Sequence, residues 1–244
     1  MRYKMILQYN GTCYSGWQRQ KNGVSVQEEL EAALSKLYGE EIKAVASGRT
    51  DAGVHAEGQV VHFDAPETIP AAKIPLALNN FLPDDISAVS AEKAADDFNA
   101  RFSAKRKTYV YRMYISPVRL PLKDLFAVRI SLMPDLEKMR AAARHIAGEH
   151  DFSAFLASGS VVKNTVRTVY SLEIAEKSGD IEITVEGNGF LYNMVRIIAG
   201  TLLYAGTGKI APEEIPDILA LGDRKRAGKT MPAKGLSLLC VEYD

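Results

Sequence analysis

The segment Ser47–His55 constrains the fold most, because it joins two strand-like apolar runs and carries charged residues. Ile42–Ala46 precedes it and Gln59–Phe63 follows it. Its glycines permit a positive φ and a close approach of another backbone, so Asp51 can stand forward on a bare turn. One interpretation is a polar hairpin turn with aspartate as an ordinary turn residue. However, the segment is longer than the roughly two to five residues that a hairpin needs, which favours a functional role.

Arg49 and His55 lie on either side of Asp51 in the sequence. A carboxylate held near cations stays ionised and can act as a nucleophile or a base. No second catalytic carboxylate is evident beside it, which weakens the alternative of a glycosidase. Asp51 is therefore the first candidate catalytic residue.

Composition allows one large domain or two smaller ones. The chain has 244 residues, of which 47% are hydrophobic and 25% charged, and its formal net charge is zero. Nucleic-acid binding would thus need a local basic surface. Cys13 and Cys240 lie far apart and lack a metal-ligand spacing, which fits a reducing cytosol. No apolar run approaches the roughly 18 residues of a membrane helix, so we expect a cytoplasmic protein without a membrane partner.

The periodicity of the chain predicts an α+β protein. The first half has the order βαββαβ of a ferredoxin-like unit, with Ser25 as the N-cap of the first helix and Gly39 at its end. Predicted strands and helices lie at 3–9, 26–37, 42–47, 57–64, 74–81, 86–93 and 108–115, and then at 135–147, 166–175, 180–187, 190–204, 215–219 and 236–241.

The break at Ser116–Pro121 is interpreted as a crossover between two halves. We therefore predict a ferredoxin-like (RRM-like) half at 1–116, which carries the Asp51 loop, and a second such half at 117–244. Together they would form one continuous, mixed and mostly antiparallel sheet. The helices would cover one face, and the active-site cleft would be central.

Basic residues gather around the strand at 108–115, and no acid lies between positions 100 and 120. These residues are Arg101, Lys105, Arg106, Lys107, Arg112 and Arg119. One interpretation is a solvated edge strand protected by its charges. The other is a phosphate-binding surface, with the interleaved Tyr109, Tyr111 and Tyr114 as stacking platforms for unpaired bases.

Arg196 is a lone cation within the apolar run Phe190–Ile198. It is either a surface cation of the helix or, since a buried arginine needs a partner, the partner of a catalytic carboxylate. Asp51 is the obvious candidate for that carboxylate. The histidines lack a ligand spacing, so no metal site is expected.

Gly48–His55 resembles the catalytic loop of the tRNA pseudouridine synthase A (TruA) family, and further similarity extends over most of the chain. The matching segments are Tyr9–Gly11, Gly16–Gln20, Ser25–Glu28, Phe98–Ala104, Lys107–Tyr111, Gly148–Phe152, Met194–Arg196 and Gly235–Leu236. Asn193 stands where some family members carry histidine.

The resemblance implies an isomerase that converts uridine to pseudouridine at positions 38, 39 and 40 of the tRNA anticodon stem-loop. It implies no cofactor, no metal and a homodimer whose tRNA contacts both subunits. Asp51 would be the nucleophile, and whether it attacks C1′ of the sugar or C6 of the base, or acts through a glycal, is left open.

The resemblance also implies roles for further residues. Tyr109 would stack on the uracil and Arg196 would pair with Asp51. Arg49 would fill the stack or contact phosphate, and Leu238 would form an apolar wall of the pocket. Arg101, Lys105, Arg106 and Lys107 would bind the RNA backbone.

Two other classes of protein share some of these features. An RNA nucleosidase or glycosylase would use the same aspartate but release free uracil. A non-catalytic RNA-binding module would keep the basic surfaces and have no need of Asp51.

Overall fold

The computed structural model describes residues 1–159 and 162–243. The chain divides into two compact units, Met1–Lys105 with Ser237–Asp244, and Arg106–Leu236. Both contain strands and helices, and among the described residues each has a parallel strand pair beside antiparallel ones. The predicted α+β class with a mixed sheet is therefore confirmed. The ferredoxin-like nature of the halves and the central cleft stay predictions.

The first unit has the predicted order βαββαβ, followed by the last strand of the chain. Its elements are β1 (Arg2–Tyr9), α1 (Val26–Tyr38), β2 (Ala44–Ala46), β3 (His55–Asp64), α2 (Ile74–Leu78), β4 (Ile86–Lys93) and β10 (Leu236–Glu242), with short 3-10 turns at Gly11–Cys13 and Ala71–Lys73. The strands run in the order β4-β1-β3, and β2 and β10 pair with different parts of β3.

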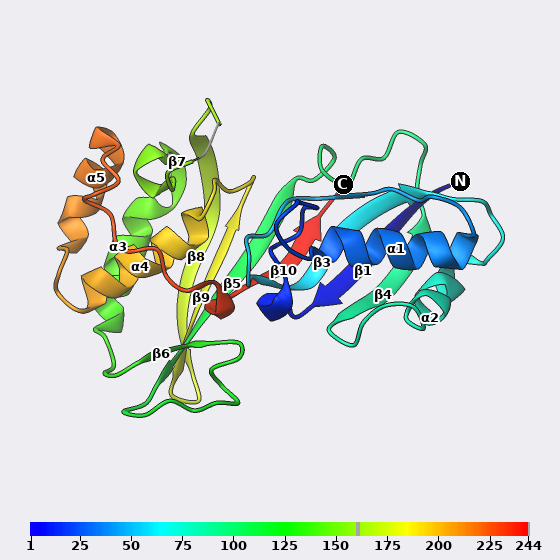
Figure 1. The fold of residues 1–244 in the computed structure, drawn as a ribbon. Coiled ribbons are helices and arrows are strands. Elements are labelled where there is room, and N and C mark those ends of the chain that lie inside the picture. Colours follow the sequence, from blue (N-terminus) through cyan, green and yellow to red (C-terminus); the bar gives the residue numbers. More distant parts are fainter. Residues whose placement is uncertain (160–161, 244) are drawn as a thin grey trace. The chain divides into compact units, whose positions relative to one another are not determined.

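Burial along β1 alternates as a half-buried strand requires. Tyr3, Met5, Leu7 and Tyr9 are buried on the face that packs under the helices, where Tyr38 of α1 contacts Phe63 of β3. The opposite face is covered by the segment that follows β4. There Arg2 donates to the carbonyls of Asp96 and Phe98 at 2.6 and 3.1 Å. Figure 1 shows α1 lying along the strands of this unit.

The second unit contains five strands and three helices among its described residues. They are β5 (Arg106–Ile115), β6 (Val128–Ile130), α3 (Leu136–Ile146), β7 (Gly148–Asp151), β8 (Val166–Lys177), β9 (Asp180–Gly187), α4 (Met194–Gly206) and α5 (Ile215–Leu221), with 3-10 turns at Ser153–Phe155, Pro212–Glu214 and Ala233–Gly235. The strand order is β5-β9-β8-β7, with β6 parallel to β5. The three helices lie on one side of these strands (Figure 1).

The boundary between the units differs from the predicted one at 116/117. β5 pairs with β9 and so belongs to the second unit, whereas β10 pairs with β3 and returns to the first. The predicted crossover at Ser116–Pro121 consequently lies inside the second unit. Strand pairing between segments that are distant in the sequence decides this division. Local sequence signals cannot predict such pairing.

Local sequence signals predict the ends of most helices and strands to within a few residues of the observed ends. Ser25 caps α1 by accepting a hydrogen bond from the Glu28 N–H, and Gly39 ends the helix with a φ of 74°. The predicted helix at 190–204 instead spans Met194–Gly206, because Asn193 takes the left-handed conformation with a φ of 61° and sets a new start. The short strands β6 and β7 were not predicted. No described helix combines the length and apolarity needed to cross a bilayer.

Asp135 provides a test of the local forces in α3. Its carboxylate accepts a hydrogen bond from the Lys138 N–H at 3.0 Å, and the side chain is 44% exposed. Asp135→Ala should lower the free energy of unfolding by about 1 kcal/mol, because a helix N–H loses its acceptor. Asp135→Asn keeps an acceptor and should stay within about 0.5 kcal/mol of the parent. Urea denaturation measures both, and equal losses in the two variants would contradict the capping role.

Candidate active site

Asp51 lies on the loop formed by residues 47–54, which joins β2 to β3. The loop ends in a turn in which the Val54 N–H donates to the Asp51 carbonyl at 3.1 Å. Gly53, the third residue of that turn, has a φ of 76°. Such a turn requires glycine or asparagine at this position. Asp51 itself is half-buried and takes the first position of this turn.

The backbone of a glycine-rich segment, residues 10–17, holds this loop from one side. The Trp17 N–H donates to the Thr50 carbonyl at 3.0 Å, and the Gly53 N–H donates to the Tyr14 carbonyl at 3.3 Å. A Cβ at Gly11 would lie 2.0 Å from the Val54 carbonyl oxygen, and one at Gly16 would lie 2.6 Å from that of Thr50. The backbones of these two segments therefore approach at a distance that only glycine allows.

Buried polar side chains hold the loop from below. The Thr50 hydroxyl lies 2.8 Å from the Tyr9 hydroxyl. The Gln59 amide, which is fully buried, donates to the Gly48 carbonyl at 3.0 Å and accepts from the Ser47 hydroxyl at 2.7 Å. Burial raises the pKa of Tyr9 to about 12, so its phenol stays neutral. The only signal of Tyr9 and Gln59 in the sequence is their polarity inside strand-like apolar runs.

His55 has a different role from the one the sequence suggested. Its Nδ1 accepts a hydrogen bond from the Gly11 N–H at 3.0 Å, and the ring is 3% exposed. Both nitrogens of a protonated imidazole are donors, so an accepting Nδ1 means a neutral ring. The expectation of a cationic His55 beside Asp51 is therefore wrong. His55 instead fixes the backbone of Gly11, which packs against the loop.

Arg49 and Leu238 belong to the same unit as Asp51. Arg49 is exposed and makes no hydrogen bond or ion pair with the residues that the structure describes. Leu238 is 1% exposed and pairs with Ala56 across the parallel contact between β10 and β3. It therefore lies beside the point where the loop enters β3. A Cβ at Gly58 would be 2.5 Å from the Leu239 carbonyl oxygen, so glycine allows β10 to approach.

The predicted basic residues divide between the two units. Arg101 and Lys105 are exposed and belong to the first, while Arg106 and Lys107 begin β5 in the second. Arg106 forms an ion pair with Glu186 at 2.7 Å and lies 4.8 Å from the centroid of the Tyr170 ring. Its charge is thus already partly balanced, which the count of local charges did not reveal.

Tyr109 lies on the helix-covered face of β5. It is 8% exposed, and its ring packs edge-to-face against Phe190 with centroids 5.3 Å apart. Phe190 is half-buried and lies in the connection between β9 and α4. Phe190 is a neighbour of Tyr109 that sequence reasoning did not identify.

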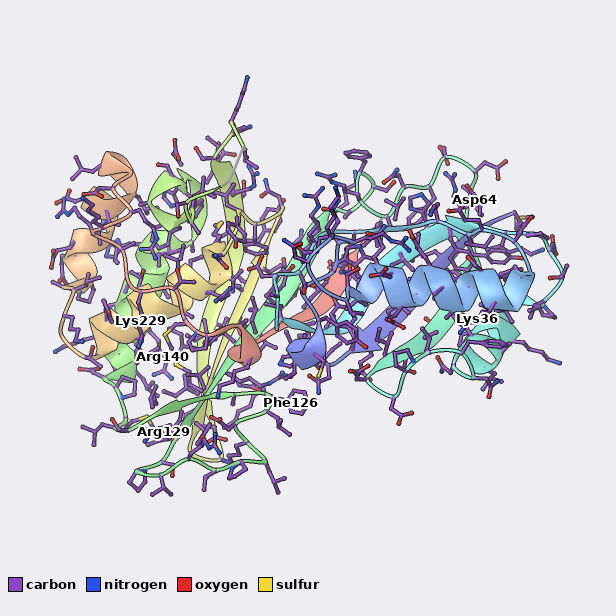
Figure 2. All side chains as sticks on the ribbon, in the orientation of Figure 1. Lys36, Asp64, Phe126, Arg129, Arg140 and Lys229 are labelled. Atoms are coloured by element: carbon purple, nitrogen blue, oxygen red, sulfur yellow. The ribbon has the colours of Figure 1, made fainter. Side chains whose placement is uncertain are left out.

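Arg196 is half-buried near the start of α4, and two groups of the second unit orient it. Its Nε donates to the Met231 carbonyl at 2.7 Å, and its Nη1 donates to the Asn193 carboxamide at 2.5 Å. The segment that carries Met231 packs tightly on the helix. A Cβ at Gly200 would lie 1.9 Å from the Lys229 carbonyl oxygen. Figure 2 labels Lys229 beside α4.

Asn193 has a defined role at the start of α4. Its left-handed backbone begins α4, and its side chain holds the Arg196 guanidinium. Asparagine is among the few residues other than glycine that tolerate this conformation. Across the described ranges there is no group of three or more His, Cys, Asp or Glu side chains arranged to hold a metal ion.

The fold and the loop define an α+β protein with one carboxylate presented on a rigid turn. A family model described as tRNA pseudouridine synthase matches residues 5–103 and 142–244. The chain belongs to this family, and the resemblance seen in the sequence is confirmed. Tyr109, Lys105, Arg106 and Lys107 lie between the two matched stretches.

Two similar proteins of known name match along nearly their whole length. A tRNA pseudouridine synthase A from Thermoanaerobacter sp. (strain X514) is 49% identical over 239 residues, which cover 98% of each chain. A tRNA pseudouridine synthase A from Bacillus subtilis (strain 168) is 48% identical over 246 residues, with 100% of both chains covered. A solved structure titled as a Cbf5-Nop10-Gar1 complex is 16% identical with a TM-score of 0.39, over 97% of this chain and 48% of the other.

His62 links β3 to the segment that follows β4. Its Nδ1 accepts a hydrogen bond from the Ala100 N–H at 3.0 Å, and its ring packs edge-on to Phe98. Burial, followed by the charge of Arg2, lowers the pKa of His62 below its ordinary value. The folded protein consequently prefers the neutral imidazole.

This preference makes stability depend on pH. Between the folded pKa and the unfolded value of about 6.5, the unfolded chain binds more protons at this residue. The contribution of His62 is therefore fully present above pH ~6.5 and is lost as pH falls toward the folded pKa. Urea denaturation at pH 7.5, 6.5 and 5.5 should show a larger loss of stability in the parent than in His62→Gln. Parallel pH profiles would contradict the prediction, because the other histidines are common to both proteins.

Proposed function

We propose that the protein isomerises uridine to pseudouridine at positions 38, 39 and 40 of the tRNA anticodon stem-loop. The full-length match to proteins named tRNA pseudouridine synthase A is the observation that supports this most strongly. The loop geometry agrees with it, since Asp51 is the carboxylate of the matching loop and is fixed by backbone and side-chain contacts. A tRNA-modifying enzyme works where tRNA is present, so we place it in the cytoplasm.

The reaction rearranges one nucleotide and needs no external reagent. The N1–C1′ bond breaks, the uracil turns, and a C5–C1′ bond forms. The proton on C5 is lost and N1 gains one, so the composition of the RNA is unchanged. We assign Asp51 as the nucleophile, because a carboxylate with an ordinary pKa of about 3.9 is ionised at neutral pH. Attack at C1′ and attack at C6 both agree with this role, whereas Asp51 would act as a base in a route through a glycal.

The target base must leave the stack before it can react. Base flipping costs a few kcal/mol. We assign Arg49 to the space that the base leaves or to a neighbouring phosphate, since its side chain is exposed. Leu238 would form an apolar wall beside the loop. Tyr109 would stack on the uracil, and because Phe190 packs against its ring, we expect Phe190 to shift when RNA binds.

We assign Arg196 as the residue that orients Asp51 and keeps it charged. The support from the structure is the fixed guanidinium, which the Met231 carbonyl and the Asn193 side chain hold. An arginine held in one orientation loses less conformational entropy when it pairs with a carboxylate. For the backbone of the RNA we assign Arg101, Lys105 and Lys107, with a smaller share for Arg106 because Glu186 already balances part of its charge.

Asp51→Asn tests the central assignment. The amide has nearly the same shape as the carboxylate but cannot be a carboxylate nucleophile, so isomerisation should be abolished while tRNA affinity stays within a few-fold. Pseudouridine mapping by carbodiimide treatment and primer extension measures the product. A matched control is Asp64→Asn at the far end of β3 (Figure 2), which should retain activity.

The outcomes of this experiment separate the classes of protein. Turnover by an Asp51→Asn preparation that is free of parent enzyme would contradict the role of Asp51 as the nucleophile. Release of free uracil by the parent would indicate a glycosylase, and tRNA binding without any product would indicate a binding module.

We further propose that the protein is a homodimer, and an exposed apolar surface of the second unit supports this. The connection from β5 to α3 carries apolar side chains that are 38% to 87% exposed: Val118, Leu120, Leu122, Leu125, Phe126, Leu132 and Met133. Figure 2 labels Phe126 and Arg129 in this region. Large apolar patches on a protein surface often mark protein interfaces. A second copy of the chain is the partner that the family resemblance implies.

A paired substitution tests the dimer. Leu122 and Leu132 are 87% and 79% exposed, and changing both to Glu should convert dimer to monomer in light scattering coupled to gel filtration, because charges would be buried in the interface. Leu76→Glu on α2 is the control, since Leu76 is 74% exposed but lies in the first unit. A parent that is monomeric at micromolar concentration would overturn the proposal.

A further inference from the structure

Phe102 is an aromatic side chain that the fold leaves in solvent. It is 79% exposed, whereas the other exposed aromatic residues, Phe81, Phe126, Tyr170 and Tyr192, are 43% to 49% exposed. It lies in the connection between β4 and β5. A single exposed apolar side chain is common and does not by itself indicate a function. The residues around Phe102 do indicate one.

The turn that carries Phe102 is closed by its own side chains. The Asn99 carboxamide accepts hydrogen bonds from the N–H groups of Arg101 and Phe102 at 3.0 and 3.2 Å. The Ser103 hydroxyl accepts from the Asn99 N–H at 3.1 Å, and the Ser103 N–H donates to the Asn99 carbonyl at 2.9 Å. These four bonds set the backbone direction at Phe102, so the ring points outward in the free protein.

Buried side chains anchor the same turn to the sheet. Ala100 is fully buried, its N–H donates to His62, and its carbonyl accepts from the Tyr243 hydroxyl at 2.7 Å. His62 lies on β3, and Gln59 on the same strand donates to the Gly48 carbonyl of the Asp51 loop at 3.0 Å. Satisfied buried networks rigidify the groups that they join. The Phe102 turn and the Asp51 loop therefore share one rigid support within the first unit.

The chemistry around the ring suits a nucleotide. The Arg101 guanidinium lies 5.5 Å from the centroid of the Phe102 ring, and Arg101 has no ion pair among the described residues. Lys105, three residues further on, is also exposed. An aromatic face with adjacent cations is the arrangement that binds unpaired bases, because the ring stacks on the base and the cations contact the phosphates.

We propose that Phe102 is a stacking platform for one unpaired base of the RNA substrate, with Arg101 contacting the phosphate next to that base. This inference rests on the proposed function, which supplies an RNA whose stack is opened. Stacking favours no particular base, so the platform would hold the strand in position while the loop selects the uridine. Phe102 is thus a positioning residue, and it takes no part in the chemistry.

The proposal is tested by tRNA affinity as a function of salt. Phe102→Ala should weaken binding by about 5- to 150-fold, the equivalent of the ~1–3 kcal/mol of one base–aromatic stack, and leave the slope of log K against log salt unchanged. Arg101→Met should instead reduce that slope by up to about 0.9, because one phosphate contact is lost. Phe102→Tyr should retain affinity, and Phe81→Ala should have no effect.

Phe102→Trp gives a second readout. The chain has one tryptophan, Trp17, which is 3% exposed, so a new exposed indole would dominate any quenching by RNA. Quenching on addition of tRNA supports stacking. Urea denaturation should place each variant within about 0.5 kcal/mol of the parent, as for other surface changes.

Several outcomes would overturn the inference: unchanged affinity in Phe102→Ala, an equal loss in Phe81→Ala, or a change of oligomeric state with RNA binding intact. The last would identify a protein contact. Pseudouridine mapping with the parent is done in parallel. If the parent modifies tRNA but Phe102→Ala binds normally, only the stacking site fails, whereas a parent without product refutes the proposed function itself.

Discussion

The close backbone contact between the glycine-rich segment 10–17 and the loop 47–54 is the constraint on which the candidate site depends. At Gly11 and Gly16 the backbones of the two segments lie so close together that no side chain would fit between them. His55, Tyr9 and Gln59 then use their polar groups to fix what the contact brings together. Asp51 is presented by this assembly, so the backbone and the buried polar groups around the loop set its position.

The two arginines of the proposed site show two ways of placing a cation. Arg196 is held by a carbonyl and a carboxamide, which fix the orientation of its guanidinium. Arg49 is exposed and can follow a moving substrate. A fixed charge suits a partner that stays in the protein, and a mobile one suits a nucleic acid that arrives and leaves. Arg106, which is paired with Glu186, fits neither description well.

Local chemistry made part of this structure predictable. Ser25, the apolar stripe after it and Gly39 define α1 within one residue, because caps and periodicity act over a few positions. The glycine-flanked loop predicts Asp51 as a site residue, and this role stays a prediction, whereas the turn closed at Gly53 is present in the structure. The neutral state of His55 was not predictable, because it depends on Gly11, which is close only after folding. The pairing of Arg106 with Glu186 and the pairing of β10 with β3 were not predictable either, because each joins segments that are distant in the sequence.

The position of β10 has a consequence for biosynthesis. β10 supplies Leu238 and is followed by Tyr243, yet the ribosome makes it only after the whole second unit. The first unit therefore cannot complete its sheet while it emerges, although its own βαββαβ segment is synthesised first. Domains usually fold as units during synthesis, N-terminal part first. Here a nascent chain would carry the Asp51 loop for some time without the strand beside it, and the site would be completed only when synthesis of the second unit is over.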